Sequence, residues 1–123
     1  MAISIKTAED IAGLRVAGRL AGELLDYLTP YVQPGITTAE LDRLAYDYTI
    51  SQGCIPACLG YTPPGMTPYP ATTCISINHV VCHGIPGPKK LKDGDIVNID
   101  VTSIKDGYHG DTSRMFVVGK PTI

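Results

Sequence analysis

Residues 96–116, IVNIDVTSIKDGYHGDTSRMF, indicate a β-hairpin that carries two aspartates, Asp100 and Asp111. A β-branched run precedes the dipeptide Asp106-Gly107, and strand-like residues resume directly after it. Asp-Gly between two such runs is a strong short-range signal for a two-residue hairpin turn. The stretch therefore predicts two antiparallel strands joined at this dipeptide.

The predicted turn also sets the register of the hairpin. With Asp106 and Gly107 at the turn, Asp100 pairs with Ser113. Side chains on one face of a strand recur at every second residue, so Asp111 shares that face and lies diagonal to Asp100, about 7 Å away at Cα. A three-residue loop with a bulge would instead move one aspartate to the opposite face. The two-residue turn predicts carboxylates that converge on one point.

Converging carboxylates repel each other unless a proton or a cation lies between them. A divalent metal resolves the repulsion, and oxygen ligands suit manganese, iron(II), cobalt or zinc. The alternative is that Asp100 and Asp111 lie on a solvated outer face, where aspartate is usually found. Spacing alone leaves both interpretations open.

Composition limits the classes of partner. The 123 residues are 44% hydrophobic and 18% charged, with a formal net charge of -2. This balance describes one soluble globular domain without the basic surface that binds nucleic acid. No apolar run approaches the about 20 residues of a membrane span. The opening MAISIKTAED lacks the charged and then apolar segments of a signal peptide, so we expect a cytoplasmic protein.

The four cysteines are expected to be reduced. Pairs of cysteines form disulfides in secreted chains, whereas a cytoplasmic protein keeps its thiols. Their spacing also lacks the paired C-x₂-C pattern of a structural zinc site. We therefore expect small, mostly buried thiols at Cys54, Cys58, Cys74 and Cys82.

Two helices are predicted before the strands. Thr7 and Thr37 each stand three residues before an acidic residue, which is the pattern of a helix N-terminus. The first helix should end before Pro30 and the second at Gly53. The first helix is predicted to be amphipathic. The face that it turns to the core is expected to carry Ile11, Leu14, Gly18, Ala21, Leu25 and Leu28.

The segment between the helices and the hairpin combines a loop with shorter strands. Residues 60–70 hold four prolines and two glycines and are predicted to form a loop, which is either plain surface or the wall of a pocket. Residues 73–78 alternate like a strand, and VVCHGIP at 80–86 is predicted to be its partner across an Asn78-His79 turn. Two helices followed by mainly antiparallel strands predict an α+β fold.

Two histidines are candidates for chemistry. His83 lies at the end of an apolar segment, from which it could project into a cleft. His109 shares strand parity with Asp111 and is a possible additional ligand. A lone histidine is more often a structural residue, so this alternative also stays open.

The motifs CHGIP, NIDVT and HGDTS, together with ACLGY and CISIN, resemble those of type I methionine aminopeptidases. The resemblance covers nearly all of the 123 residues. It implies that residues 1–123 form the N-terminal half of a pita-bread fold, the architecture of creatinases and methionine aminopeptidases. It also implies that the second half is absent from this chain.

The resemblance assigns roles to individual residues. It implies that Asp100 and Asp111 hold metal, and that His83 contacts the scissile peptide of the substrate. It further implies that the pocket for the methionine side chain is lined by Cys58, Tyr61, Tyr69 and Cys74. Soft sulfur and aromatic edges suit a thioether guest.

The family's two-metal centre also needs a histidine and two glutamates from the second half. The glutamates of this chain all lie in the predicted helices, at Glu9, Glu23 and Glu40. We therefore expect the chain alone to bind metal weakly and to release no methionine. In the complete enzyme, two divalent ions would act on N-terminal methionyl peptides or nascent chains. Without the second half, the chain would expose a sheet edge and an apolar face. A missing C-terminal half or a homodimer would cover them.

Two other functions are weighed against this one. A non-catalytic binding module of the same fold would have no need of Asp100, Asp111 and His83 together. A proline-peptide hydrolase of the same fold fits the motifs ACLGY and CHGIP less well. The resemblance therefore favours a metal-dependent methionine aminopeptidase.

Overall fold

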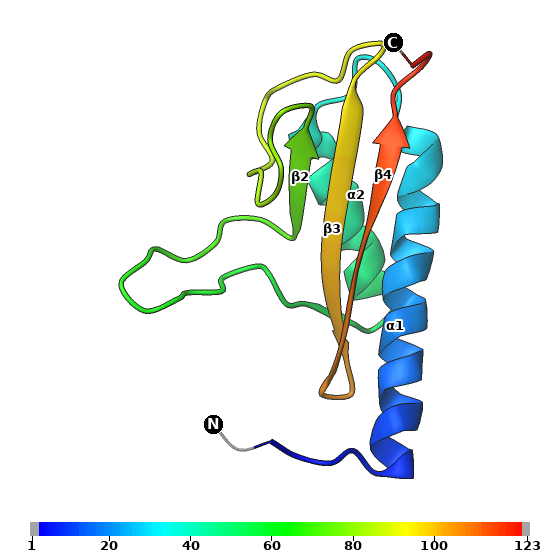
Figure 1. Cartoon of the computed structure of the whole chain (residues 1–123), viewed down its shortest axis with the longest axis vertical. Coiled ribbons are helices and arrows are strands. Elements are labelled where there is room, and N and C mark those ends of the chain that lie inside the picture. Colours follow the sequence, from blue (N-terminus) through cyan, green and yellow to red (C-terminus); the bar gives the residue numbers. More distant parts are fainter. Residues whose placement is uncertain (1–2, 122–123) are drawn as a thin grey trace.

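The computed structural model describes residues 3–121, so the first two residues of the opening segment and the last two of the chain lie outside it. The elements are α1 (Ala8–Leu28), the 3₁₀ helix η1 (Thr29–Tyr31), α2 (Thr38–Ser51), β1 (Ile55–Pro56), β2 (Thr73–Ile77), β3 (Ile96–Lys105) and β4 (Tyr108–Val117). Both helices lie on the same side of an antiparallel sheet, and a long loop projects from the opposite edge (Figure 1). The predicted α+β class is confirmed.

The helices begin and end where the sequence predicts. The Thr7 side chain accepts a hydrogen bond from Asp10 N, and the Asp10 carboxylate accepts one from Thr7 N, which completes the capping box of α1. The Thr37 side chain caps α2 by accepting a hydrogen bond from Glu40 N. Gly53, with φ of +71°, turns the chain after α2.

The predicted buried face of α1 is wrong in its first half. Ile11 is 44% exposed and Gly18 is exposed, whereas Ala17 is fully buried. The reason is that this half of α1 packs closely against β4. A Cβ added at Gly110 would collide with the carbonyl oxygen of Ala17. The closest approach of the strand thus selects which side of the helix is covered.

Strand β3 is the centre of the sheet. It pairs with β4 along one edge, from Ile96 opposite Val117 to Lys105 opposite Tyr108. Along its other edge it pairs with both β1 and β2. The two short strands therefore lie end to end beside β3. The long loop that connects them projects away from the sheet (Figure 1).

The core lies between the helices and one face of the sheet. Alternate residues of β3 are buried there, at Val97, Ile99 and Val101. They join a cluster with Leu24, Leu25, Leu28, Leu41, Ile75, Ile77, Leu91, Phe116 and Val118. The intervening residues of β3, including Asp100, lie on the opposite face and are only partly buried. The polar side chains thus occupy the face of the sheet that the helices leave open.

The prediction of a strand at residues 80–86 is wrong. The Asn78-His79 turn is present, but the segment after it is irregular. It contacts β2 through the hydrogen bond from Ile75 N to Gly84 O, at 2.8 Å. His83 has φ of +59°, a left-handed conformation that interrupts any extended strand.

No helix in residues 3–121 combines the length and the hydrophobicity needed to cross a lipid bilayer. Cys54 and Cys74 are buried, Cys58 is partly buried and Cys82 is exposed, and each is a free thiol.

Candidate functional site

The hairpin has the register that the sequence predicts. Asp100 pairs with Ser113, and Asp111 pairs with Thr102, so the two aspartates lie diagonally on one face. The turn consists of Asp106 and Gly107, with φ of +50° and +85°. Positive φ at both central residues is the type I′ geometry, whose twist matches that of the strands.

A cavity of about 760 Å³ lies over this face of the hairpin. Its walls come from the long loop, from β2, from the irregular segment after β2, and from both strands of the hairpin. His109 lines it. So do all seven residues that the resemblance singles out: Cys58, Tyr61, Tyr69, Cys74, His83, Asp100 and Asp111. The fold thus gathers into one cavity residues that lie far apart in the sequence.

The surroundings of the Asp100 carboxylate change its pKa. Burial raises its pKa above the ordinary value, and the negative charge of Asp111 raises it further. The nearby His83 acts in the opposite direction. Asp100 and Asp111 are therefore close enough to interact electrostatically, with the histidine beside them.

The proline-rich loop is one wall of the cavity. Its two sides pair at the base, where Gly60 N donates to Tyr69 O and Tyr69 N donates to Tyr61 O, both at 2.8 Å. Beyond this pairing, Met66 also faces the cavity, although it is 66% exposed. Of the two interpretations of this loop, the structure supports the pocket wall.

Two of the four thiols face the same cavity. Cys74 pairs with Asp100 across the two strands, and Cys58 follows β1. Burial is the main cause that raises the pKa of both thiols. Both therefore remain neutral near pH 7, and they form a soft apolar wall rather than a reactive pair.

Sequence reasoning missed Thr102, which lines the cavity between the two aspartates. Its strand parity with Asp100 was a signal that could have identified it. Ala57 and Ile85 also line the cavity. Nothing in their local sequence marks them, because the path of the loop and of the irregular segment places them there.

The carboxylates of Asp100 and Asp111 fit a divalent cation, since both are oxygen donors, share one face and line one cavity. Within residues 3–121, no three His, Cys, Asp or Glu side chains come together closely enough to hold a metal ion.

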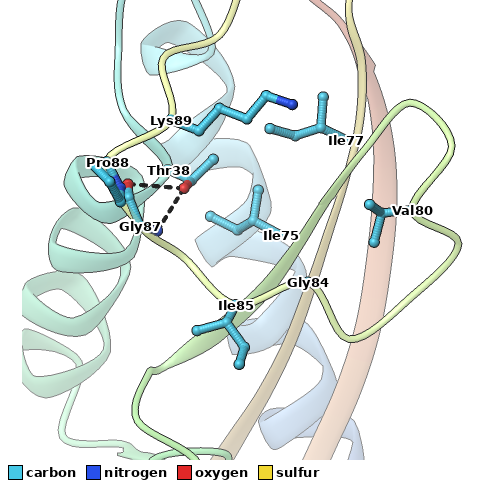
Figure 2. A pocket seen from close by; sticks show the side chains of 9 residues that line it. All are labelled: Thr38, Ile75, Ile77, Val80, Gly84, Ile85, Gly87, Pro88 and Lys89. Atoms are coloured by element: carbon cyan, nitrogen blue, oxygen red, sulfur yellow. Dashed lines mark hydrogen bonds between the residues drawn. The ribbon is translucent and has the colours of Figure 1, made fainter.

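A second cavity, of about 450 Å³, lies between the start of α2 and the segment after β2 (Figure 2). The hydroxyl of Thr38 donates to Gly87 O and accepts from Gly87 N, at 3.1 and 2.8 Å, and ties the two sides together. The lining is largely apolar, with Ile75, Ile77 and Ile85. None of the predicted site residues lines it.

The model of metallopeptidase family M24 matches residues 12–123. The chain belongs to metallopeptidase family M24.

Within family M24, the chain is 65% identical over its whole length to the methionine aminopeptidase of Escherichia coli K12, and it spans 46% of that protein. The crystal structure of the methionine aminopeptidase from Rickettsia prowazekii matches 98% of the chain with a TM-score of 0.92 and 50% identity, and the match spans 47% of that structure. The predicted resemblance to methionine aminopeptidases is confirmed.

A more distant structural match shows the fold alone. The prolidase from Pyrococcus furiosus matches 97% of the chain with a TM-score of 0.78 at 23% identity, and the match spans 32% of that structure. The pita-bread fold is confirmed by these matches. The chain spans about half the length of the methionine aminopeptidases it matches.

Proposed function

We propose that the M24 protein containing this chain removes N-terminal methionine from peptides and nascent chains, and that residues 1–123 are the N-terminal half of its catalytic domain. The observation that carries the proposal is the single cavity lined by all seven predicted site residues. The 65% identity to a methionine aminopeptidase supports the same substrate class. Nascent chains emerge in the cytoplasm, and we place the reaction there.

In this proposal Asp100 and Asp111 hold the metal. Two divalent ions, of manganese, iron, cobalt or zinc, would supply Lewis acidity and an activated water. The hairpin contributes rigidity, because paired strands and the type I′ turn fix the separation of the two carboxylates. A histidine and two glutamates from outside the chain would complete the coordination sphere.

The remaining cavity residues would bind the substrate. His83 lines the cavity beside Asp100, where its imidazole would contact the scissile peptide and stabilise charge on its oxygen. Cys58 and Cys74 would contact the methionine thioether from the sheet side. Tyr61 and Tyr69 would enclose it from the loop side.

The open face of the sheet is the surface on which we place the second half. The chain spans 46% of its Escherichia coli relative. A protein of that relative's length would have a segment of comparable size to cover this face. A homodimer is the alternative occupant. It would bring together two carboxylate pairs without the additional ligands.

Hydrolysis of a methionyl peptide by the complete protein, with added manganese or cobalt, tests the proposal. We expect Asp100→Asn and Asp111→Asn each to lower kcat/KM by at least about 100-fold, because each change removes an ionised ligand. Asp47→Asn, on the exposed face of α2, is the matched control. Full activity of either site variant would refute the assignment of the metal ligands.

A further inference from the structure

The turn at His83 and Gly84 is pressed against β2. His83 adopts φ of +59°, which disfavours an L-residue and needs support from its surroundings. Gly84 follows it with no room for a side chain, because an added Cβ would collide with the carbonyl oxygen of Ile75. The conformation of His83 therefore depends on how Gly84 is held on the strand.

Both peptide groups of Gly84 are bound to β2. Gly84 N donates to the hydroxyl oxygen of Ser76 at 3.0 Å, and Gly84 O accepts from Ile75 N at 2.8 Å. Ser76 is 3% exposed and is not among the residues that line the cavity. Its hydroxyl therefore serves the turn and lies away from the space where a substrate would bind.

Tyr69, at the base of the long loop, provides a second contact to Gly84. Its hydroxyl oxygen lies 2.8 Å from Thr73 O and 3.3 Å from Gly84 O. One proton is shared between these acceptors, so the shorter bond to Thr73 is the stronger. Burial raises the pKa of Tyr69 far above its ordinary value, and the hydroxyl remains a donor at every physiological pH.

The acceptor of Tyr69 is itself anchored to α2. Thr73 N and Thr73 Oγ1 both donate to the Asp42 carboxylate, at 2.8 and 2.6 Å. Hydrogen bonds therefore run without a break from α2 through Thr73 and Tyr69 to Gly84. Gly84 is thus held at its N–H by Ser76 and at its carbonyl oxygen by this chain of bonds.

We propose that Ser76 and Tyr69 are positioning residues for His83: by fixing Gly84 on β2 they hold His83 in its left-handed conformation at the cavity. The inference rests on the proposed function insofar as His83 contacts the substrate. Ser76 is the sharper test, because it acts on the turn alone, whereas Tyr69 also lines the cavity.

The first measurement is amide hydrogen exchange in the complete protein. In Ser76→Ala the Gly84 amide loses its acceptor, and we expect it to exchange about tenfold faster, the ratio that corresponds to one typical hydrogen bond. The amide of Ile99 in β3 should be unaffected. Ser76→Thr keeps the hydroxyl and should restore protection, and Ser51→Ala at the exposed end of α2 is the control.

The second measurement is steady-state kinetics with a methionyl peptide. A reacting group displaced by about 1 Å loses on the order of 100-fold in rate, so we expect Ser76→Ala and Tyr69→Phe to lower kcat at least about tenfold. KM for Ser76→Ala should stay within about twofold, because the walls of the cavity are intact. Tyr46→Phe, a tyrosine at the surface of α2, is the control for Tyr69→Phe.

The two measurements separate the possible failures. Unchanged exchange of the Gly84 amide in Ser76→Ala overturns the positioning role, whatever the activity. Faster exchange with unchanged kcat in an active enzyme also overturns it, because His83 would then work without the support. If the wild-type protein releases no methionine, the proposed function fails, and the φ angle of His83 in Ser76→Ala, measured from NMR couplings, decides the positioning role by itself.

Discussion

Gly110 separates two residues of the cavity, His109 and Asp111, and its own role is steric. It is buried against α1, where a Cβ would collide with the carbonyl of Ala17. The side chains on either side of it face the cavity, while this position faces the helix. One glycine thus lets α1 support the hairpin directly beneath the aspartates.

Replacement of this glycine should therefore destabilise the protein. We expect Gly110→Ala to lower the free energy of unfolding by about 1–3 kcal/mol, the usual cost of overpacking a close contact. Urea unfolding monitored by circular dichroism measures the change. In Gly18→Ala, on α1, the new methyl group meets open space. We expect this variant to gain about 0.5–1 kcal/mol in the free energy of unfolding. Equal effects of the two variants would contradict the steric explanation.

Asp95 makes stability depend on pH. It is 7% exposed, and its carboxylate accepts from Asn78 Nδ2 and Lys92 N at 3.0 and 2.9 Å. These bonds lower its pKa below 3.8, with the Asn78 bond as the largest cause. A lowered pKa in the folded state means that the stabilisation is complete above the unfolded value and is lost as the pH falls through the folded one.

We therefore expect the wild-type protein to lose stability below about pH 4 more steeply than Asp95→Asn does. At pH 7 the variant should be less stable than the wild type, and the difference should shrink in acid. Chemical unfolding at a series of pH values measures both curves. Asp106→Asn at the exposed turn is a control, and a gap that widens in acid would contradict the role of Asp95.

At the scale of elements, the hairpin β3–β4 depends on its turn. Gly107 has φ of +85°, which strains any residue with a Cβ. We expect Gly107→Ala to cost about 1–2 kcal/mol, the penalty of the left-handed region. Thermal unfolding measures this cost. Asn is favoured at the first position of the same turn, so Asp106→Asn should be close to neutral and serves as the matched comparison.

The pairing of β1 and β2 along one edge of β3 places the long loop beside the cavity. β1 and β2 both pair with the edge of β3 that faces away from β4, and the loop between them leaves and re-enters the sheet at neighbouring points. Cys58 therefore lies near Cys74 although the loop separates them in sequence. The loop between β1 and β2 thus forms a wall of the cavity, while the core on the other face of the sheet is unaffected.

At the scale of the whole molecule, the open face of the sheet carries an apolar patch. Ile96, Met115 and Val117 share the face of the aspartates and are 44%, 57% and 48% exposed. In the proposed protein this face is covered by the second half. In isolation it should be adhesive, because exposed apolar patches and free strand edges promote association.

The isolated 123-residue chain should therefore self-associate and release no methionine. Size-exclusion chromatography with light scattering measures the first, and a methionyl-peptide assay with manganese or cobalt measures the second. We expect Val117→Lys to shift the chain towards the monomer, whereas Ile50→Lys, at an exposed position of α2, should leave association unchanged. A monomeric wild-type chain, or one with robust turnover, would contradict this prediction.

Much of the site was predictable because its central part is local. The register of the hairpin follows from the Asp106-Gly107 turn and from the alternation of side chains along a strand, and both are properties of neighbouring residues. The caps at Thr7 and Thr37 are local in the same sense. The resemblance to methionine aminopeptidases then connected Cys58 and His83 with the aspartates.

The tertiary structure decided what depends on contacts between distant residues. Residues 80–86 have the composition of a strand, but β3 pairs with one edge of β2 and the bonds from Ser76 and Ile75 hold Gly84 at the other, so the segment becomes a turn. The buried side of α1 is likewise set by Gly110, far along the chain. Local sequence determines which elements form, whereas the space left between packed elements determines which of their surfaces meet.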